Sequence, residues 1–156
     1  MTQTTVLFVC LGNICRSPLA EGAMREAAER AGLDIKVDSC GTGNWHIGEA
    51  PDIRARSIAR RKGVDLDMLR GRQLAAEDYT RFDYIFALDH DNLEVIRDRC
   101  PADSTAEISL LMDVVPGHEG EPVADPYFGG DEGFEVTWSD VSKAANALVE
   151  RFSKNP

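Results

Sequence analysis

Residues 4–22, TTVLFVCLGNICRSPLAEG, contain an apolar run that ends at a cysteine, a short glycine-containing loop and the start of a helical pattern. The run at residues 4–10 has the length and apolar content of a buried strand. Ser17 and Pro18 predict the helix start, with the serine hydroxyl as N-cap and the proline at the first helical position. Gly32 is expected to end this helix, so the stretch forms a strand–loop–helix unit.

Alternating strands and helices continue along the rest of the chain. Further strands are predicted at residues 35–40, 84–88 and 106–111. Further helices are predicted at residues 52–63, 91–100 and 132–153, and a glycine-rich loop at 41–51. The short connections predict an α/β fold, an open four-stranded parallel sheet with helices on both faces. Such sheets bind ligands at the carboxyl ends of their strands. The loop after the first strand lies at that edge, and its residues, CLGNICRS, make it a candidate phosphate-binding loop.

Length and charge exclude several classes of protein. The chain of 156 residues has the composition of one globular domain, which we place at residues 1–156. Its apolar stretches are far shorter than the ~20 residues of a membrane span. No basic segment precedes the first of them, so we expect a cytoplasmic protein with no membrane partner. The formal net charge of -10 argues against nucleic acid as a partner, so an anionic substrate would need a local site.

The cysteines are expected to be reduced thiols. Without a secretory signal, the spacing of Cys10, Cys15, Cys40 and Cys100 does not suggest a disulfide framework. It does not suggest a metal site either, because no second Cys or His pair accompanies the first two cysteines and the histidines are scattered. We therefore expect neither a metal nor another cofactor.

The loop CLGNICRS carries a Cys-x5-Arg pattern that leads into a helix N-terminus. Its backbone N–H groups can converge on a tetrahedral oxyanion, and the helix dipole adds to the attraction. The same field is expected to stabilise the thiolate of Cys10, which makes it a candidate nucleophile. The planar guanidinium of Arg16 can bind two phosphoryl oxygens, which no lysine does in this way. The pattern is not that of an ATP-binding loop, because the loop has no lysine.

Loop residues other than Cys10 and Arg16 are expected to bind the substrate or to brace the loop. The small Gly12 lets the backbone approach the anion closely, and Asn13 and Ser17 can brace the loop or hydrogen-bond the thiolate. The substrate-binding residues predicted here are Leu11, Gly12, Asn13, Ile14, Cys15 and Ser17. The alternative interpretation of the motif is a buried cysteine that ends a strand, with the arginine on the surface.

Transfer of a phosphoryl group to Cys10 would also need a proton donor for the leaving oxygen, and ADPYFGG at residues 124–130 contains a candidate. Asp125 precedes Pro126, which favours an extended backbone at the acid. Tyr127 and Phe128 can form pocket walls. Taken alone, this segment also fits an ordinary turn.

Together these motifs resemble the low-molecular-weight protein tyrosine phosphatase family. The resemblance runs over nearly the full length, through VLFVCLGNICRSP, DSCGTGNWHIGEAPD, FDYIFALDHDN and DPYFGG. It implies a metal-independent hydrolysis of phosphotyrosine and small aryl phosphates through a phosphocysteine. By position, it implies Cys10 as nucleophile, Arg16 as phosphate clamp and Asp125 as general acid and later base. The implied partner is a phosphotyrosine-containing protein, with a tyrosine kinase as one candidate.

The resemblance also implies roles for residues around these three. Loop-supporting positions are matched by Asn13, Ser17 and Ser39, and the aromatic rim by Trp45, Tyr127 and Phe128. For the tryptophan, the alternative is an ordinary partly buried loop aromatic. One departure is Leu69, near which relatives usually carry a histidine that supports the loop. The support is expected either to be weaker here or to come from another group.

Three rival functions follow from the same motifs. An arsenate reductase has a similar fold and loop but needs further cysteines to relay a disulfide, and in the second half of the sequence Cys100 stands alone. A phosphoarginine phosphatase is closer. In that subgroup, however, a threonine is expected at the loop position that Ile14 occupies in this chain. A phosphate-binding module without catalysis is disfavoured by the joint presence of Cys10, Arg16 and Asp125.

Cys15 has two interpretations. It follows Cys10 by five residues in a loop that curls around an anion, so the two sulfurs could form a disulfide after a modest backbone change. In that case it would capture a sulfenic acid on Cys10 and make peroxide inactivation reversible. In the other interpretation it is a small buried residue that fills space under the loop.

Overall fold

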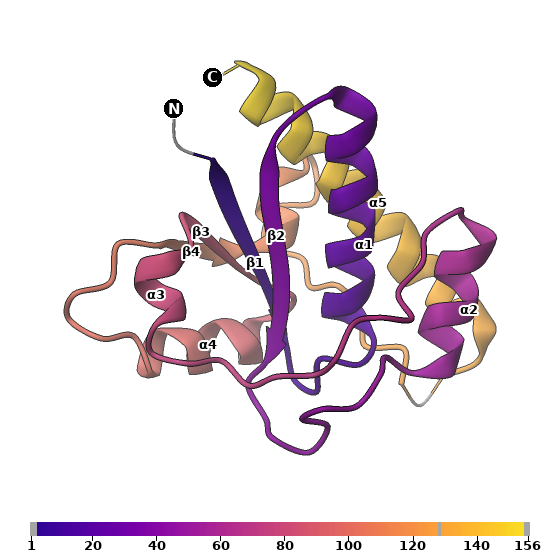
Figure 1. Ribbon diagram of the computed structural model, residues 1–156, viewed down its shortest axis with the longest axis horizontal. Coiled ribbons are helices and arrows are strands. Elements are labelled where there is room, and N and C mark those ends of the chain that lie inside the picture. The colour runs from indigo at the N-terminus through magenta and orange to yellow at the C-terminus, as the bar shows by residue number, and fades with distance from the viewer. Residues whose placement is uncertain (1–2, 128, 155–156) are drawn as a thin grey trace.

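The structure of the chain, a computed structural model, describes residues 3–127 and 129–154. Its centre is a sheet of four parallel strands in the order β2-β1-β3-β4 (Figure 1). Their bounds are β1 (Thr4–Cys10), β2 (Ile35–Gly41), β3 (Tyr84–Ala87) and β4 (Glu107–Leu110). The predicted open four-stranded parallel sheet is confirmed, although β4 is shorter than predicted because a 3₁₀ turn, η1 (Leu111–Val114), follows it at once.

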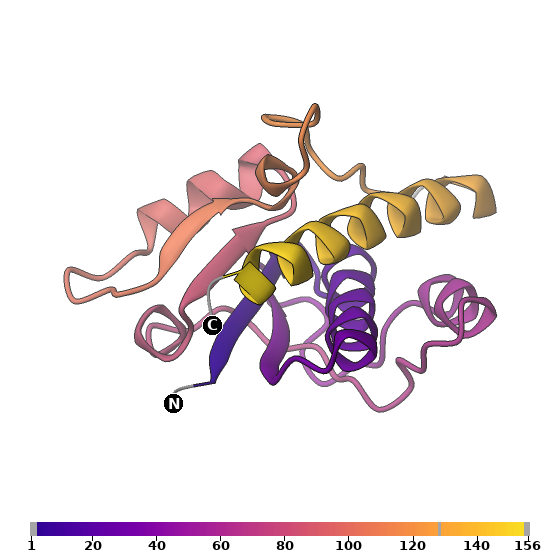
Figure 2. The ribbon, with the colours of Figure 1, turned by 90° about the horizontal axis from the view of Figure 1, so that it is seen from above.

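Helices cover both faces of the sheet, as predicted. Their bounds are α1 (Arg16–Ala31), α2 (Ile53–Arg61), α3 (Asp78–Arg81), α4 (His90–Asp98) and α5 (Asp131–Lys154). The helices α1, α2 and α5 lie on one side of the sheet, and α3 and α4 on the other (Figure 2). The short α3 is not predicted by the sequence pattern. Among the helices described, none is both long and apolar enough to cross a membrane.

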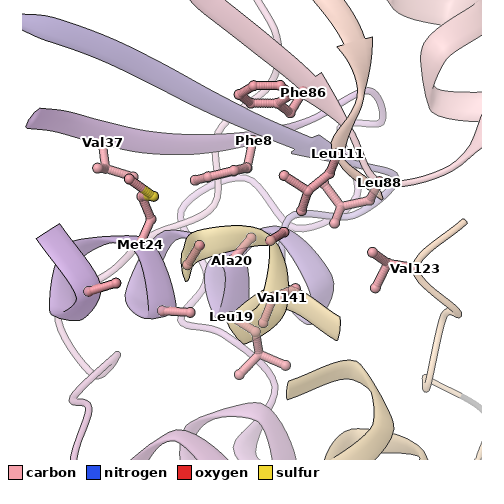
Figure 3. Packing of buried hydrophobic residues seen from close by; sticks show 14 of the residues in the cluster. Phe8, Leu19, Ala20, Met24, Val37, Phe86, Leu88, Leu111, Val123 and Val141 are labelled. Carbon is pink, nitrogen blue, oxygen red and sulfur yellow. The ribbon is translucent and has the colours of Figure 1, made fainter. Parts of the chain in front are cut away.

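The central strand β1 contributes to two hydrophobic layers. Phe8 and Cys10 face the layer beneath α1 and α5, whereas Leu7 and Val9 face the layer beneath α3 and α4. Successive side chains of a strand point to opposite faces, and both faces are covered here, so the run is apolar at nearly every position. Figure 3 shows Phe8 beside Phe86, with ring centroids 6.1 Å apart, above the side chains of α1. This packing places the side chain of Cys10 at the carboxyl end of β1, on the side of α1.

The start of α1 differs from the prediction. Its N-cap is Cys15, which makes no side-chain capping bond, and Ser17 is already inside the helix. The Ser17 hydroxyl lies 2.9 Å from Sγ of Cys10 and therefore serves the loop instead of the helix end. Pro18 is tolerated in the first turn because N–H groups there have no partner within the helix. The prediction of a serine cap followed by proline at the first position is wrong.

The carboxyl end of β2 packs closely against the loop that follows β1. A Cβ atom on Gly41 would lie 2.8 Å from the carbonyl oxygen of Leu11, so only glycine allows this approach. Beyond it, the N–H of Thr42 donates to the carbonyl of Cys10 at 2.9 Å, and the N–H of Gly43 donates to that of Leu11 at 2.9 Å. These contacts fix the first loop to the loop that carries Trp45.

Candidate active site

A pocket of about 200 Å³ opens at the carboxyl end of β1, between the loop after β1, the loop after β2 and the segment before α5. Its lining residues are Cys10, Leu11, Gly12, Ile14, Cys15, Arg16, Trp45, His46, Asp125 and Tyr127. All of these except His46 are predicted from the sequence. Of the other predicted site residues, Asn13, Ser17 and Ser39 lie beneath the loop, and Phe128 lies outside the described residues.

The sulfur of Cys10 has two hydrogen-bonding neighbours from its own loop. The N–H of Asn13 donates to Sγ at 3.3 Å, and the hydroxyl of Ser17 lies 2.9 Å from it. Because the same hydroxyl oxygen accepts a bond from Nδ2 of Asn13 at 2.8 Å, its hydrogen is available to the sulfur. The other acceptor within reach of that hydrogen, the carbonyl of Cys40, is farther away at 3.4 Å. Both neighbours therefore suit a negatively charged sulfur.

Asn13 braces the loop from beneath. Its φ of 57° is in the left-handed region, which asparagine adopts more readily than most residues. Its Nδ2 donates to Oγ of Ser17 and Ser39, the latter at 3.0 Å, and its Oδ1 accepts from the N–H of Arg72 at 3.1 Å. Ser39 in turn donates to Oε1 of Glu21 at 2.6 Å. These bonds connect both serines to Asn13 beneath the loop.

Glu21 and Arg72, which the sequence analysis does not predict, provide the far ends of this network. Burial raises the pKa of the Glu21 carboxyl, although its hydrogen bond from Ser39 opposes the shift. The guanidinium of Arg72 binds both oxygens of Asp78 at 3.0 Å, which holds its backbone against the loop. Leu69, at the position where a histidine is usual, packs against the core on the α1 side. Of the two expectations for that position, support from other groups is the one that these contacts favour.

Arg16 is buried but retains its charge. Its Nη1 donates to Oδ2 of Asp89 at 2.7 Å and to the carbonyl of Val123 at 3.0 Å, while Nη2 lies 3.5 Å from Oδ2 of Asp125. Burial alone would lower the pKa of Arg16, but its electrostatic interaction with Cys10 and its hydrogen bond with Asp89 outweigh the burial and raise the pKa. The guanidinium is therefore cationic and anchored along one edge.

Asp89 is a functional residue that the sequence analysis misses. It lies two residues after the end of β3 and caps α4, with Oδ1 accepting from the N–H of Asn92 at 2.7 Å, while its other oxygen binds Arg16. An acid at the carboxyl end of a central strand was a usable signal, because sheets of this type bind ligands at that edge. His46 is also missed. It lies on the pocket wall, with Nδ1 3.2 Å from Oε1 of Glu49.

The segment before α5 brings Asp125 and Tyr127 to the pocket. The Asp125 side chain is 45% exposed, and its Oδ1 accepts from the N–H of Tyr127 at 3.0 Å. Trp45 also lines the pocket. It is 65% exposed, and its indole lies against Gly43, where a Cβ atom would collide with the ring. Two aromatic side chains thus flank an opening that contains a thiol, a guanidinium and a carboxyl group.

The chemistry of the lining suits an anionic substrate with an apolar part. In the part of the chain that the structure describes, no group of three or more His, Cys, Asp or Glu side chains could hold a metal ion.

All four cysteines are free thiols, and Cys10 and Cys15 line the pocket. Burial, followed by the charge of Asp52, raises the pKa of the Cys15 thiol, which is therefore protonated at neutral pH.

A family model described as low molecular weight phosphotyrosine protein phosphatase matches residues 5–156. The chain belongs to this family. It is 43% identical over 152 residues to the low molecular weight protein-tyrosine-phosphatase YfkJ of Bacillus subtilis, covering 96% of each chain. It is therefore a protein-tyrosine phosphatase and a phosphoric monoester hydrolase, as the sequence motifs predict.

Solved structures of other phosphatases share its fold. A protein tyrosine phosphatase from Entamoeba histolytica is 35% identical, with a TM-score of 0.91 and coverage of 97% of this chain and 98% of that chain. A Drosophila arginine phosphatase is 32% identical, with a TM-score of 0.89 and coverage of 97% and 99%, respectively. The fold of this phosphatase therefore also occurs in a protein named for a different phosphorylated residue.

Proposed function

We propose that this phosphatase hydrolyses phosphotyrosine through a phosphocysteine intermediate on Cys10, within one domain that spans residues 1–156. The observation that carries the proposal is the meeting of Cys10, Arg16 and Asp125 in one pocket, although the acid follows the cysteine by more than a hundred residues in sequence. A nucleophile, an anion clamp and a proton donor are the groups that such a reaction needs.

The phosphoryl group would bind between the loop and the start of α1. None of the side chains that the structure describes caps this helix, so its first N–H groups and the positive end of its dipole are available to phosphoryl oxygens. Arg16 would donate hydrogen bonds to two phosphoryl oxygens, and its bond to Asp89 already holds the guanidinium in a fixed orientation. Binding in this geometry places phosphorus next to Sγ of Cys10.

In the first step the Cys10 thiolate attacks phosphorus, and the bond between phosphorus and the phenolic oxygen breaks. The protonated carboxyl of Asp125 gives its proton to that oxygen, so tyrosine leaves as a neutral phenol. Arg16 and the loop N–H groups would stabilise the charge on the equatorial oxygens of the transferred group in the transition state.

In the second step water replaces the phenol. The carboxylate of Asp125, now deprotonated, takes a proton from the water as its oxygen attacks phosphorus, and the bond between phosphorus and sulfur breaks. Inorganic phosphate leaves, and both the thiolate and the protonated acid are restored. Ser17 and the N–H of Asn13 would stabilise the departing sulfur through the bonds they already make.

The pocket walls favour phosphotyrosine over phosphoarginine as the substrate. Trp45 and Tyr127 flank the pocket and can contact both faces or edges of a phenyl ring. Ile14 presents an apolar side chain to the pocket where a threonine is expected for phosphoarginine. Both observations favour a phosphotyrosine-containing protein as substrate, with a tyrosine kinase as one candidate. A reducing compartment such as the cytoplasm suits a nucleophile that must remain a thiol.

A panel of peptides tests this choice. Peptides of one sequence carrying phosphotyrosine, phosphoserine or phosphoarginine are compared by release of inorganic phosphate, without added metal. We expect kcat/KM for phosphotyrosine to exceed that for the other two by at least about tenfold, since phosphoserine is too short to reach the aromatic walls and the apolar Ile14 lies where phosphoarginine is expected to need a threonine. Faster hydrolysis of phosphoarginine would overturn the assignment.

An arsenate reductase would require cysteines placed to pass a disulfide from one to the next. Cys40 is fully buried and faces the layer beneath α3 and α4, and Cys100 packs against that same layer. Neither lines the pocket. Arsenate reduction, assayed beside the peptide panel with glutathione or thioredoxin as reductant, is therefore expected to be absent.

Replacement of Asp125 by asparagine is expected to slow phosphotyrosine cleavage by roughly 10²–10⁴-fold, the usual contribution of a positioned acid. The amide keeps the shape but has no proton to give to the phenolic oxygen. The loss should shrink for aryl phosphates with acidic phenols, whose leaving groups need less protonation. Steady-state kinetics over such a series provide the measurement, with Asp103→Asn as an exposed control. An equal loss across the series would show that Asp125 is structural.

We also propose that Cys15 makes oxidation of Cys10 reversible. Peroxide would convert the Cys10 thiolate to a sulfenic acid. The Cys15 sulfur would then attack the oxidised sulfur as the Cys15 proton passes to the departing oxygen, which leaves as water, and a disulfide forms. Wild type, Cys15→Ser and the control Cys100→Ser are inactivated with peroxide and then treated with dithiothreitol. We expect activity to return in the wild type and the control but not in Cys15→Ser. Equal recovery in all three proteins would show that Cys15 only fills space.

A further inference from the structure

Arg54 binds the segment that carries Asp125 although it belongs to α2. Its Nη2 donates to the carbonyl of Tyr127 at 2.7 Å and its Nη1 donates to that of Gly129 at 3.0 Å. Its guanidinium carbon also lies 5.7 Å from the ring centroid of Tyr127 and 4.8 Å from that of Phe134. These contacts fix the backbone two and four residues beyond the acid.

The guanidinium of Arg54 is itself held in place from the phosphate-binding loop. Asp52 accepts from Nε at 3.1 Å and from Nη2 at 3.2 Å, and its Oδ1 also caps α2 by accepting from the N–H of Arg54 at 2.8 Å. The N–H of Asp52 donates to the carbonyl of Ile14 at 2.8 Å. Burial would raise the pKa of Asp52, but the hydrogen bonds from Arg54 outweigh it and lower the pKa. The charged pair of Asp52 and Arg54 therefore joins the phosphate-binding loop to the segment that carries Asp125.

Other contacts of this segment lie on the opposite side of Asp125. Arg16 donates to the carbonyl of Val123, and the hydroxyl of Thr137 lies 3.3 Å from the carbonyl of Ala124. Beyond the acid, the segment has a local turn in which the N–H of Gly129 donates to the carbonyl of Pro126 at 2.9 Å. Arg54 thus binds the chain after Asp125 to α2, and Arg16 binds the chain before Asp125 to the start of α1.

We propose that Arg54 is a positioning residue that holds Asp125 over the leaving-group oxygen. It is absent from the pocket lining, so it would act through the acid and not on the substrate. The inference rests on the proposed role of Asp125 as proton donor. Proton transfer depends steeply on the distance between donor and acceptor, and a shift of about 1 Å from a remote change can reduce a rate substantially. Loss of Arg54 should therefore resemble a partial loss of Asp125.

The matched comparison is Arg54→Ala against Arg60→Ala. Arg60 lies on the same helix and pairs with Asp67 at 2.6 Å, away from the acid-bearing segment. For Arg54→Ala we expect kcat/KM for phosphotyrosine to fall about tenfold, with a smaller loss for aryl phosphates that have acidic phenols. The inhibition constant of inorganic phosphate should stay within about twofold of wild type, because the anion site is intact. Arg60→Ala should match the wild type in every measurement.

The double variant Arg54→Ala/Asp125→Asn decides whether Arg54 acts through the acid. We expect it to be no slower than Asp125→Asn alone, because there is no proton left to position. If Arg54→Ala fails to fold, Arg54→Lys replaces it in the comparison. The lysine keeps the charge beside Asp52 but not the planar fork, so we expect the same leaving-group dependence. A loss that is equal for all leaving groups, or that persists in the asparagine background, would overturn the inference. If Asp125→Asn itself shows no dependence on the leaving group, the proposed proton donor fails instead.

Discussion

Replacement of Cys10 by serine is expected to abolish hydrolysis while preserving phosphate binding. A serine hydroxyl ionises far less readily than a thiol, so it stays protonated at neutral pH and is too weak a nucleophile to form the covalent intermediate. The groups expected to bind phosphate remain, since the uncapped start of α1 and the bond between Arg16 and Asp89 do not involve the sulfur.

Two measurements on the purified Cys10→Ser protein check this expectation. Release of p-nitrophenol from p-nitrophenyl phosphate should be undetectable, and calorimetric titration with inorganic phosphate should give a Kd close to that of the wild type. Cys40→Ser, which changes a buried thiol on the other face of the sheet, controls for general loss of stability. Hydrolysis by Cys10→Ser above background would mean that the nucleophile lies elsewhere.

Replacement of Arg16 by lysine is expected to reduce kcat/KM by about 10³–10⁵-fold, the range found for arginines that stabilise a transferring phosphoryl group. A lysine ammonium keeps the charge but cannot bind Asp89, the carbonyl of Val123 and two phosphoryl oxygens from one rigid plane. Unlike the serine variant at Cys10, it should lose phosphate affinity together with rate.

The matched control for Arg16→Lys is Arg30→Lys in the last turn of the same helix. Arg30 is exposed and pairs with Glu26 at 3.1 Å, so its replacement should change neither kinetics nor phosphate affinity. Kinetics of Arg16→Lys within a few-fold of the wild type would show that another group clamps the phosphate.

The sheet could be predicted because its signal is local. The run of β1 is apolar on both faces, and the helices that follow have clear ends at Gly32 and Gly63, both of which adopt positive φ. The start of α1 could not be predicted in this way. A serine followed by proline is typical of a helix cap, but here the Ser17 hydroxyl is engaged by Asn13 and lies beside Cys10. A ligand-binding loop thus overrides the usual capping preference.

The candidate site shows the same division. Residues within the Cys-x5-Arg loop could be predicted because their spacing alone carries the chemistry. Glu21 and Arg54 act on the site only through the fold, from helices whose sequences have no unusual feature, whereas Asp89 has a usable signal in its place after a central strand. Arg54 in particular reads as one of several arginines on an exposed helix, and its bonds to Tyr127 and Gly129 depend on how α2 packs beside α5.

Rapid-quench mass spectrometry during turnover tests the central claim of a phosphocysteine most directly. Wild-type protein is mixed with a phosphotyrosine peptide, quenched under conditions that preserve the bond between sulfur and phosphorus, and digested, with Cys10→Ser treated in parallel. We predict the mass of one phosphoryl group on the peptide spanning residues 1–16, located by fragmentation to Cys10 and absent from Cys10→Ser. Phosphate on Cys15 or elsewhere in the wild type, or turnover without any phosphoenzyme, would contradict the account.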